Sequence, residues 1–238
     1  MEVMPLILLI NLNKDTERLQ SSVSESSRLG IVFVRIEAKS VDTLENKSTF
    51  NFSRAVEACW ASHLSALEFL VQSDKEYAVI LEDDFKIRDS RKFMETLAKL
   101  ETLKFDLVQL GFLSIGIRNR MNILIENLQA LLLRIFLILG KMHLPIFQSH
   151  LNRMRIRLIR DTPIGYVPNS FQAGSHAYAI SRNLAQAILG DHKSFVLPAD
   201  GFLSALAGAG GITSFRRIRS LVGQKSFLGS MRSTKIRE

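Results

Sequence analysis

The 238-residue sequence is 47% hydrophobic and 23% charged, a balance that predicts a sizeable folded core and excludes a largely disordered chain. Its single cysteine, Cys59, excludes an internal disulfide framework and a zinc cluster built from cysteines. The formal net charge of +8 lies mainly in residues 115–160 and 212–238, on an otherwise slightly acidic body. Such basic blocks favour anionic partners: phospholipid, nucleic acid or phosphorylated glycans.

The first elements predict a βαβ unit. Residues 6–10 are an apolar run that is too brief for a signal peptide and is typical of a buried strand. A polar helix is predicted over residues 16–29, ended by Gly30, and a second strand over 31–36. A long helix follows over about residues 53–72.

His63 lies on the apolar face of this long predicted helix, together with Cys59 and Leu67. Two interpretations stay open for it. It is either a core histidine that is hydrogen-bonded to backbone, or a residue beside the phosphates or sugar of a ligand.

Residues 77–84 (YAVILEDD) are the stretch around which the chain is organised. An apolar strand runs into three adjacent carboxylates, which repel one another unless a cation lies close by. Ligands of open α/β sheets bind at the carboxyl ends of the strands, and Glu82 and Asp84 are spaced to share one hard divalent cation. The alternative is a solvated turn with three exposed acids.

A helix over about 90–103 and a strand over 106–112 complete a β-α-β-α-β-α-β order. This order predicts an α/β fold with a mostly parallel sheet covered by helices. The basic segment 115–160 interrupts it, with a Leu- and Ile-rich helix predicted over 121–141. Asn127, Arg134 and Lys141 recur at intervals of seven, which predicts an interfacial helix with its cations toward lipid headgroups. Packing on the core and a membrane span are the alternatives.

The last third of the chain returns to the α/β pattern. A strand is predicted over residues 173–180, a helix over 182–189, and a turn at 198–201 that places Asp200 before a helix over 202–207. The basic tail, residues 212–238, is predicted to be irregular. We expect one catalytic domain over residues 1–238, with the helical basic insertion at 115–160.

Five segments, in order, together resemble glycosyltransferase family 25. This family includes lipopolysaccharide glycosyltransferases and collagen galactosyltransferases. Each match is weak alone, and together they cover most of residues 5–203. The segments are residues 9–18 (LINLNKDTER), 58–63 (ACWASH), 79–84 (VILEDD), 174–181 (GSHAYAIS) and 198–200 (PAD).

The resemblance implies a GT-A-like, Rossmann-type fold and an inverting transfer of a hexose, galactose or glucose, from a UDP-sugar. The implied acceptor is a lipopolysaccharide or lipooligosaccharide. It implies Mn²⁺ or Mg²⁺ at Asp84 and Glu82, which would neutralise the departing diphosphate. Asp200 is the predicted general base, with a helix N-cap as its alternative role. The predicted donor-binding residues are Asn11, Asn13, Arg18, His63, Glu82, Asp83 and His176.

Two departures from the family pattern bear on activity. Asn13 stands where an aspartate is usual, and residues 115–165 and the tail match poorly. A different nucleotide-sugar-binding or nucleotidyltransferase-type protein, or a degenerate non-catalytic member, therefore stays open. The basic blocks have few aromatics for base stacking, so no nucleic-acid partner is expected. We expect a cytoplasmic protein, peripheral on the inner face of the cytoplasmic membrane.

Overall fold

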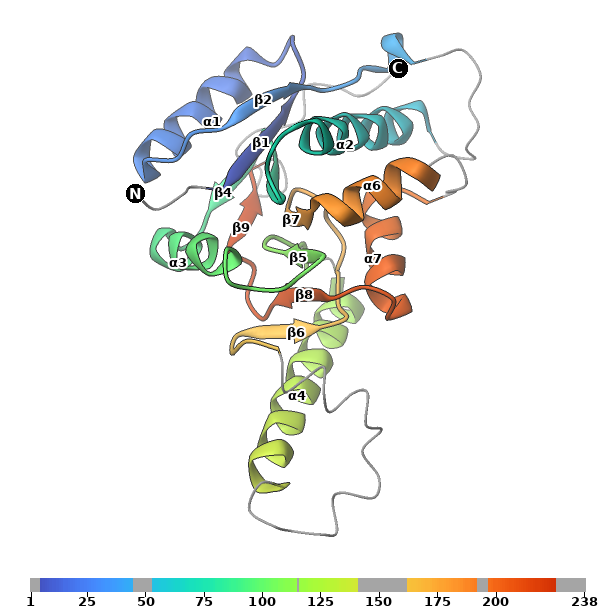
Figure 1. Cartoon of the computed structure of the whole chain (residues 1–238). Coiled ribbons are helices and arrows are strands. Elements are labelled where there is room, and N and C mark those ends of the chain that lie inside the picture. Colours follow the sequence, from blue (N-terminus) through green and yellow to red (C-terminus); the bar gives the residue numbers. More distant parts are fainter. Residues whose placement is uncertain (1–4, 45–52, 115, 141–161, 192–196, 226–238) are drawn as a thin grey trace.

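The computed structural model describes residues 5–44, 53–114, 116–140, 162–191 and 197–225 (Figure 1). The strands are β1 (Leu6–Asn11), β2 (Val34–Glu37), β3 (Tyr77–Glu82), β4 (Phe85–Ile87), β5 (Leu107–Gln109), β6 (Tyr166–Pro168), β7 (Ala177–Ser181), β8 (Ser214–Arg217) and β9 (Val222–Gln224). The helices are α1 (Thr16–Leu29), α2 (Arg54–Gln72), α3 (Ser90–Leu100), α4 (Gly116–Gly140), α6 (Arg182–Asp191) and α7 (Ala199–Ala209), with a 3₁₀ turn η1 (Val41–Thr43).

A seven-stranded sheet in the order β2-β1-β3-β7-β5-β8-β6 forms the centre of the described chain. Strands β2, β1, β3, β5 and β8 run in one direction, and only β7 and β6 run against them. A separate two-stranded sheet pairs β4 with β9. The predicted α/β class with a mostly parallel, Rossmann-type sheet, as in GT-A folds, is confirmed.

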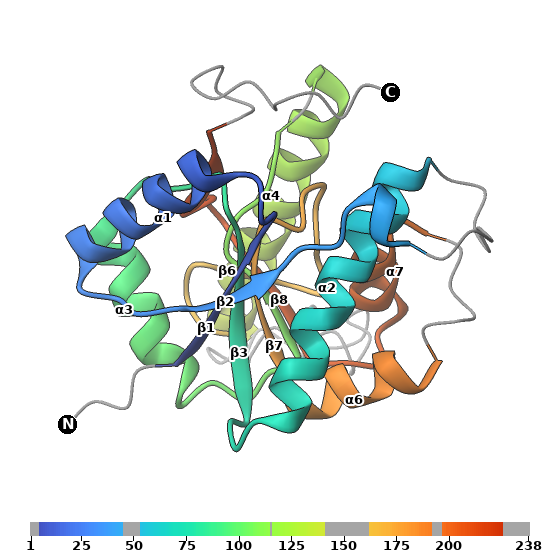
Figure 2. The same ribbon diagram turned by 90° about the horizontal axis from the view of Figure 1, so that it is seen from above.

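Helices cover both faces of the sheet, as the sequence order predicts (Figure 2). Alternate residues of the strands point to opposite faces, so Leu8 and Ile80 pack toward α2, α6 and α7. Ile7 and Val79 pack into the core on the other face, which also contains Phe93 of α3. Both core clusters are built from side chains that are almost fully buried, so the sheet is fixed from two sides.

The prediction of an irregular tail is wrong for residues 214–217 and 222–224, which form β8 and β9. A run with Arg216 and Arg217 does not look like a buried strand, because an unpaired buried charge is costly. Arg216 is nevertheless 0% exposed. Its guanidinium donates to the Glu126 carboxylate at 3.0 Å and to the Ser170 hydroxyl at 2.9 Å, and it lies over the Phe112 ring.

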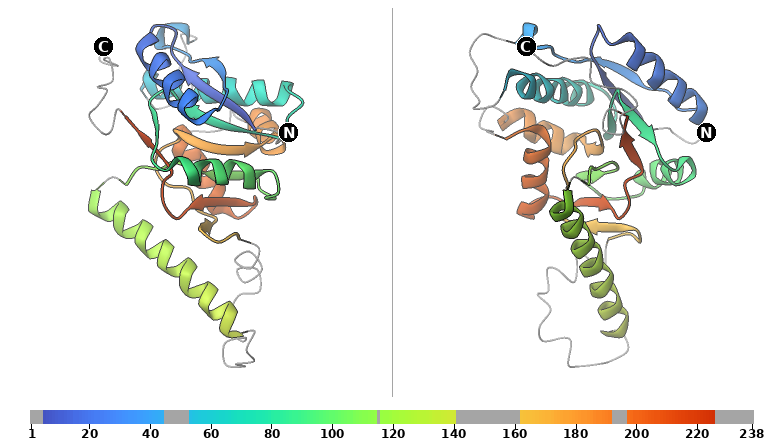
Figure 3. Two further views of the ribbon diagram at one scale, coloured as in Figure 1. Left: turned by 90° about the vertical axis from the view of Figure 1, so that its left-hand side faces the viewer. Right: turned by 180° about the vertical axis from the view of Figure 1, so that it is seen from behind.

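Helix α4 leaves the sheet beside β6 and projects away from the body (Figures 1 and 3). The prediction that its polar stripe carries cations toward lipid headgroups is wrong for Asn127 and Arg134. Asn127 contacts Arg216 at 3.1 Å and the Ile218 carbonyl at 3.3 Å. Arg134 donates to backbone carbonyls, including that of Tyr166 at 3.3 Å. The polar stripe therefore faces the protein, because it satisfies polar groups there.

The opposite side of α4 is an exposed apolar stripe. Its members recur at intervals of three and four residues, so they share one helix face. This α4 stripe consists of Ile117, Met121, Leu124, Ile125, Leu128, Leu131, Leu132 and Ile135, which are 42–83% exposed. No helix within the described ranges combines the length and apolar character needed to cross a membrane.

Two parts of the predicted basic regions lie outside the described residues. They are residues 141–161, which contain Lys141 and the four arginines 153, 155, 157 and 160, and residues 226–238. The division into a catalytic domain, an insertion and a tail stays a prediction.

Replacing Glu126 tests whether the buried Arg216 depends on it. We expect Glu126→Ala to lower the free energy of unfolding by about 3 kcal/mol, because a fully buried guanidinium loses its only nearby carboxylate among the described contacts. Urea denaturation measures this change. Glu95→Ala is the matched control, since Glu95 forms an exposed pair with Arg91 that is worth about 0.5 kcal/mol at most. Equal effects of both substitutions would contradict the role of Glu126.

Candidate functional site

A cavity of about 280 Å³ opens at the carboxyl ends of β1, β2 and β3. Strand β1 lies between β2 and β3, so the connection through α1 leads to one side of β1 and the connection through α2 returns the chain to its other side. Open α/β sheets bind ligands at such a switch point, because the connecting loops diverge there and leave a crevice. The loops after all three strands and the first half of α2 contribute residues to the lining.

Charged side chains of both signs line this cavity. The cations are Lys14, Arg18 and Lys39, and the principal anions are Glu82 and Asp83 at the end of β3. Asp42 is a third, exposed carboxylate of the lining. Three cations gathered near these carboxylates suit a ligand that carries negative charge of its own, held near a cation-binding group. The predicted alternative of three solvent-exposed acids does not hold, because Asp83 and Asp84 are only 6% and 3% exposed.

The side chain of Asp83 is held by two partners, one at the end of β1 and one in α1. The Asn11 amide donates to Asp83 Oδ2 at 2.7 Å, and Arg18 donates to Oδ1 at 3.0 Å. The Ser22 hydroxyl donates to the Asp83 backbone carbonyl at 2.8 Å. Burial raises the pKa of Asp83, although Asn11 and Arg18 oppose this effect. Three of the predicted donor-site residues are thus joined in one network.

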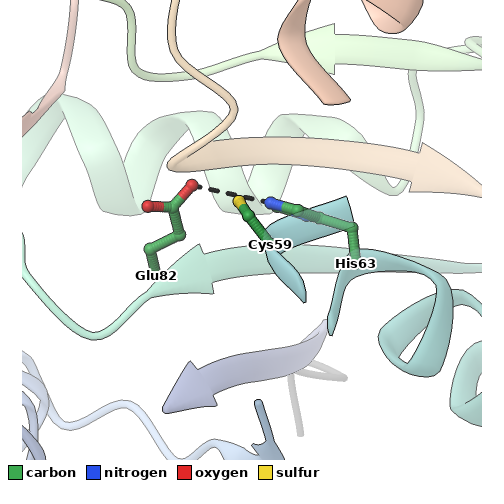
Figure 4. A group of neighbouring side chains, drawn as sticks. All are labelled: Cys59, His63 and Glu82. Atoms are coloured by element: carbon green, nitrogen blue, oxygen red, sulfur yellow. Dashed lines mark ion pairs between the residues drawn. The ribbon is translucent and has the colours of Figure 1, made fainter. Parts of the chain in front are cut away.

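Glu82 and His63 form the second contact of the acidic stretch (Figure 4). His63 Nε2 lies 3.5 Å from Glu82 Oε1, and His63 Nδ1 lies 3.0 Å from the Tyr178 hydroxyl. Ser175 donates to Glu82 Oε1 and Gln224 to Oε2, each at 3.2 Å. The carboxylate is therefore fixed from three elements, α2, β9 and the loop before β7.

These contacts change the ionisation of both groups. Burial alone would lower the pKa of His63, but Tyr178, Cys59 and Glu82 together raise it well above its usual value. Burial alone would raise the pKa of Glu82, but the nearby imidazole of His63, with His176 and Ser175, lowers it. Both pKa shifts favour the charged forms, an imidazolium beside a carboxylate.

Cys59 is a site residue that the sequence reasoning missed. It is exposed, lines the cavity, and lies one helical turn before His63 on α2. Its sulfur, a His63 nitrogen and a Glu82 oxygen all lie within 4.8 Å of one another. The spacing of four residues between Cys59 and His63 was the available signal, since such residues share a helix face.

Of the two predicted metal ligands, Glu82 lines the cavity and Asp84 does not. Asp84 lies in the turn between β3 and β4, where its backbone carbonyl accepts a hydrogen bond from Lys225 at 2.7 Å. Glu82 and Asp83 provide the oxygen donors that a hard cation prefers. The donor chemistry at this edge therefore fits Mn²⁺ or Mg²⁺, while the Glu82–Asp84 ligand pair stays a prediction.

His176 is fully buried and does not line the cavity. Its Nε2 lies 3.0 Å from the Val222 carbonyl, and a Cβ on Gly174, whose φ is +99°, would lie 2.9 Å from its Nδ1. These contacts are those of a histidine packed in the core, and the role of His176 toward the donor stays a prediction.

Asp200 lies in the first turn of α7, not in a turn before the helix as expected. It accepts hydrogen bonds from the backbone of Gly174 at 3.2 Å and of Gly201 at 2.8 Å. Ser175, which follows Gly174 in the chain, contacts Glu82. The short loop that contains Gly174 and Ser175 therefore contacts both the predicted base and the acidic stretch.

Asn13 is exposed and lies outside the cavity lining. It donates to Glu37 at 2.6 Å and accepts from Arg35 at 2.7 Å, while Arg35 also donates to Asn11 at 3.0 Å. Arg35 thus links the two predicted asparagines. A second cavity, of about 660 Å³, lies at the opposite, amino-terminal ends of β1 and β3, beside Leu6, Tyr77 and Asp106 and away from these residues.

A protein-family model described as "Glycosyltransferase family 25 (LPS biosynthesis protein)" matches residues 4–203. The matched range contains β1, β3, β7, the cavity lining and Asp200, and ends before β8. A search of curated proteins finds no match.

Removing the Asp83 carboxylate tests the network at the end of β3. We expect Asp83→Ala to lower the free energy of unfolding by about 3 kcal/mol, because it removes the carboxylate that Arg18 pairs with and one of the two acceptors of the buried Asn11 amide. Thermal and urea unfolding measure the change. Asp42→Ala, which removes an exposed carboxylate from the same cavity, is expected to stay within about 0.5 kcal/mol of the parent. A stable Asp83→Ala protein would show that the network contributes little.

Proposed function

Because the chain belongs to glycosyltransferase family 25, we propose that it is a metal-dependent, inverting hexosyltransferase. In this proposal it moves galactose or glucose from a UDP-sugar to a lipopolysaccharide or lipooligosaccharide acceptor. Membership of the family itself supports glycosyltransferase activity, with a nucleotide-sugar donor and an acceptor. The sugar, the stereochemistry and the metal are our proposals.

The observation that carries the proposal is the cavity at the ends of β1 and β3, where cations and carboxylates meet. Lys14, Arg18 and Lys39 supply positive charge to the same hollow that Glu82 lines. A nucleoside diphosphate carries the negative charge that these cations would bind, and Glu82 would hold a cation beside it. This combination suits a diphosphate–metal complex better than a neutral ligand.

The proposed reaction is a single displacement. The acceptor hydroxyl oxygen forms a bond to the anomeric carbon while the bond from that carbon to the diphosphate oxygen breaks. A general base takes the hydroxyl proton, and negative charge accumulates on the leaving diphosphate. Arg18 and Lys14 would stabilise this charge, and a bound Mn²⁺ or Mg²⁺ would supply further electrostatic stabilisation.

Asp200 is the proposed base. The amides of Gly174 and Gly201 orient its carboxylate, and the neighbouring Ser175 contacts Glu82. The contacts of this one loop with both Asp200 and Glu82 support a base close to the acidic stretch, although Asp200 does not itself line the cavity. His63, through its pair with Glu82, would keep that carboxylate ionised for the metal.

Donor turnover tests the reaction directly. We expect the protein to hydrolyse UDP-galactose or UDP-glucose, or to transfer the hexose from it, only when Mn²⁺ or Mg²⁺ is present. Asp84→Asn and Asp200→Asn are each expected to lower turnover about a hundredfold, as loss of one electrostatic or acid–base group does. Asp74→Asn, a highly exposed acid at the opposite, amino-terminal ends of β1 and β3, is the control and should leave turnover unchanged.

The alternatives give different results in the same assay. A degenerate member would bind a nucleotide sugar in the presence of Mn²⁺ without turning it over. Failure of all nucleotide sugars to bind would contradict the transferase proposal altogether. Transfer of a nucleotidyl group, detected as release of pyrophosphate, would favour the nucleotidyltransferase alternative.

We also propose that the α4 stripe rests on an anionic membrane surface that presents the glycolipid acceptor. An exposed apolar face of this size commonly marks a contact surface, and residues 115–160 carry seven basic side chains besides the inward-facing Arg134, with one acidic one. Apolar side chains at the acyl boundary and basic side chains at anionic headgroups are the pattern of interfacial helices. The projection of α4 from the body supports this orientation (Figure 3).

Vesicle flotation tests the membrane contact. We expect the protein to float with vesicles of phosphatidylglycerol and phosphatidylcholine, and the triple substitution of Leu124, Leu128 and Leu131 by Ser to weaken binding at least about tenfold. Val32→Ser, which removes an 84%-exposed apolar residue elsewhere, is the control. Unchanged flotation of the triple variant would contradict the proposal, and its dissociation from a dimer would instead assign the stripe to pairing of two copies.

A further inference from the structure

We propose that Cys59, His63 and Glu82 bind a borderline transition metal of the Zn²⁺ type at the wall of the cavity. This site differs from the predicted Mn²⁺ or Mg²⁺ site in its donor chemistry. It does not depend on hexosyl transfer, because it rests on the arrangement of the three side chains (Figure 4).

The three donor atoms are close enough to share one ion. All three lie within 4.8 Å of one another, and the His63 nitrogen and Glu82 oxygen are 3.5 Å apart. Zinc bonds of about 2.0–2.3 Å in a tetrahedral site place ligand atoms about 3.3–3.7 Å apart. The imidazole and the carboxylate already have this separation, and the exposed thiol of Cys59 lies within 4.8 Å of both.

The buried state of His63 points to a ligand. Its side chain is 1% exposed, and its Nε2 contacts Glu82 Oε1 at 3.5 Å without making a hydrogen bond of normal geometry to any described residue. The Tyr178 hydroxyl lies 3.0 Å from the other nitrogen, Nδ1. A neutral imidazole that donates from Nδ1 to this hydroxyl presents its Nε2 lone pair to the cavity, which is how a second contact usually orients a metal-binding histidine.

The chemistry of the donors selects the class of metal. A thiolate and an imidazole favour zinc and its neighbours, whereas Mg²⁺ and Mn²⁺ prefer oxygen ligands. Three protein ligands leave a fourth position, and since all three residues line the cavity, that position faces the bound ligand or water. On binding, the thiol and the imidazolium each release a proton to solvent.

Glu82 would be a ligand of both proposed metal sites, so the binding of one metal would affect the binding of the other. An ion held by Cys59, His63 and Glu82 occupies the carboxylate that the predicted hard-metal site uses. The two metals would therefore compete, and zinc would reduce Mn²⁺ binding at the same end of β3.

Titration of the full-length protein with Co²⁺, a spectroscopic substitute for Zn²⁺, tests the site. Because Cys59 is the only cysteine, a thiolate-to-cobalt charge-transfer band can come only from this residue. We expect one equivalent of Co²⁺ to produce that band together with the intense visible bands of tetrahedral cobalt, and Zn²⁺ to remove both. Because Mg²⁺ competes only for Glu82, only a large excess of Mg²⁺ should weaken these bands.

Substitutions distinguish a site formed by Cys59, His63 and Glu82 from binding to the Cys59 thiol alone. Cys59→Ser should abolish the charge-transfer band, and Glu82→Gln should lower the Co²⁺ affinity at least about tenfold, as loss of a ligand contact does. Asp42→Asn, another acid of the same cavity, should bind Co²⁺ like the parent. Cys59 is exposed, so its variant is expected to fold, and circular dichroism checks this for each protein.

The proposal is overturned if no thiolate band forms, or if Glu82→Gln binds Co²⁺ as tightly as the parent, because cobalt then binds an isolated thiol. These readouts use no sugar donor, so failure of the metal site and failure of the transferase proposal are distinguishable.

Discussion

The charge balance at the end of β3 is the constraint on which the rest of the site depends. Glu82, Asp83 and Asp84 follow a buried strand without a break, and adjacent carboxylates of low exposure destabilise a fold unless their charge is compensated. Asp83 is compensated by Arg18, and Glu82 by His63. The two compensating cations come from α1 and α2, so the helices on either side of β1 must pack correctly for the strand to end here.

This arrangement leaves the two acids with different roles. The carboxylate of Asp83 is engaged on both oxygens by Asn11 and Arg18, and so it orders the loop after β1. Glu82 keeps one side of its carboxylate toward the cavity, where Cys59 and His63 also lie. A carboxylate that is oriented but not enclosed is suited to binding an ion. The same feature supports the proposed hard-metal site and the proposed zinc-type site.

At the base of α4, buried charged side chains determine the orientation of a helix. Glu126 and Arg216 pair across the base of α4, and they turn the polar stripe of this helix inward. The apolar residues are consequently left on the outer face. An isolated amphipathic helix would be oriented by its solvent alone, but here the buried polar groups of the sheet decide which face is covered. The helix thus offers an apolar surface while remaining attached through hydrogen bonds.

The sequence by itself determined the α/β class, the position of most helices and strands, and the cluster at the end of β3, because apolar periodicity and capping residues act locally. It also indicated His63 and Arg18 at the site. Only the tertiary structure decided that β7 runs against its neighbours, that Arg216 belongs to a strand, and that Cys59 joins His63 and Glu82. These features depend on partners far along the chain: Arg216 enters the core because Glu126 meets it there, and no local pattern around either residue contains that information.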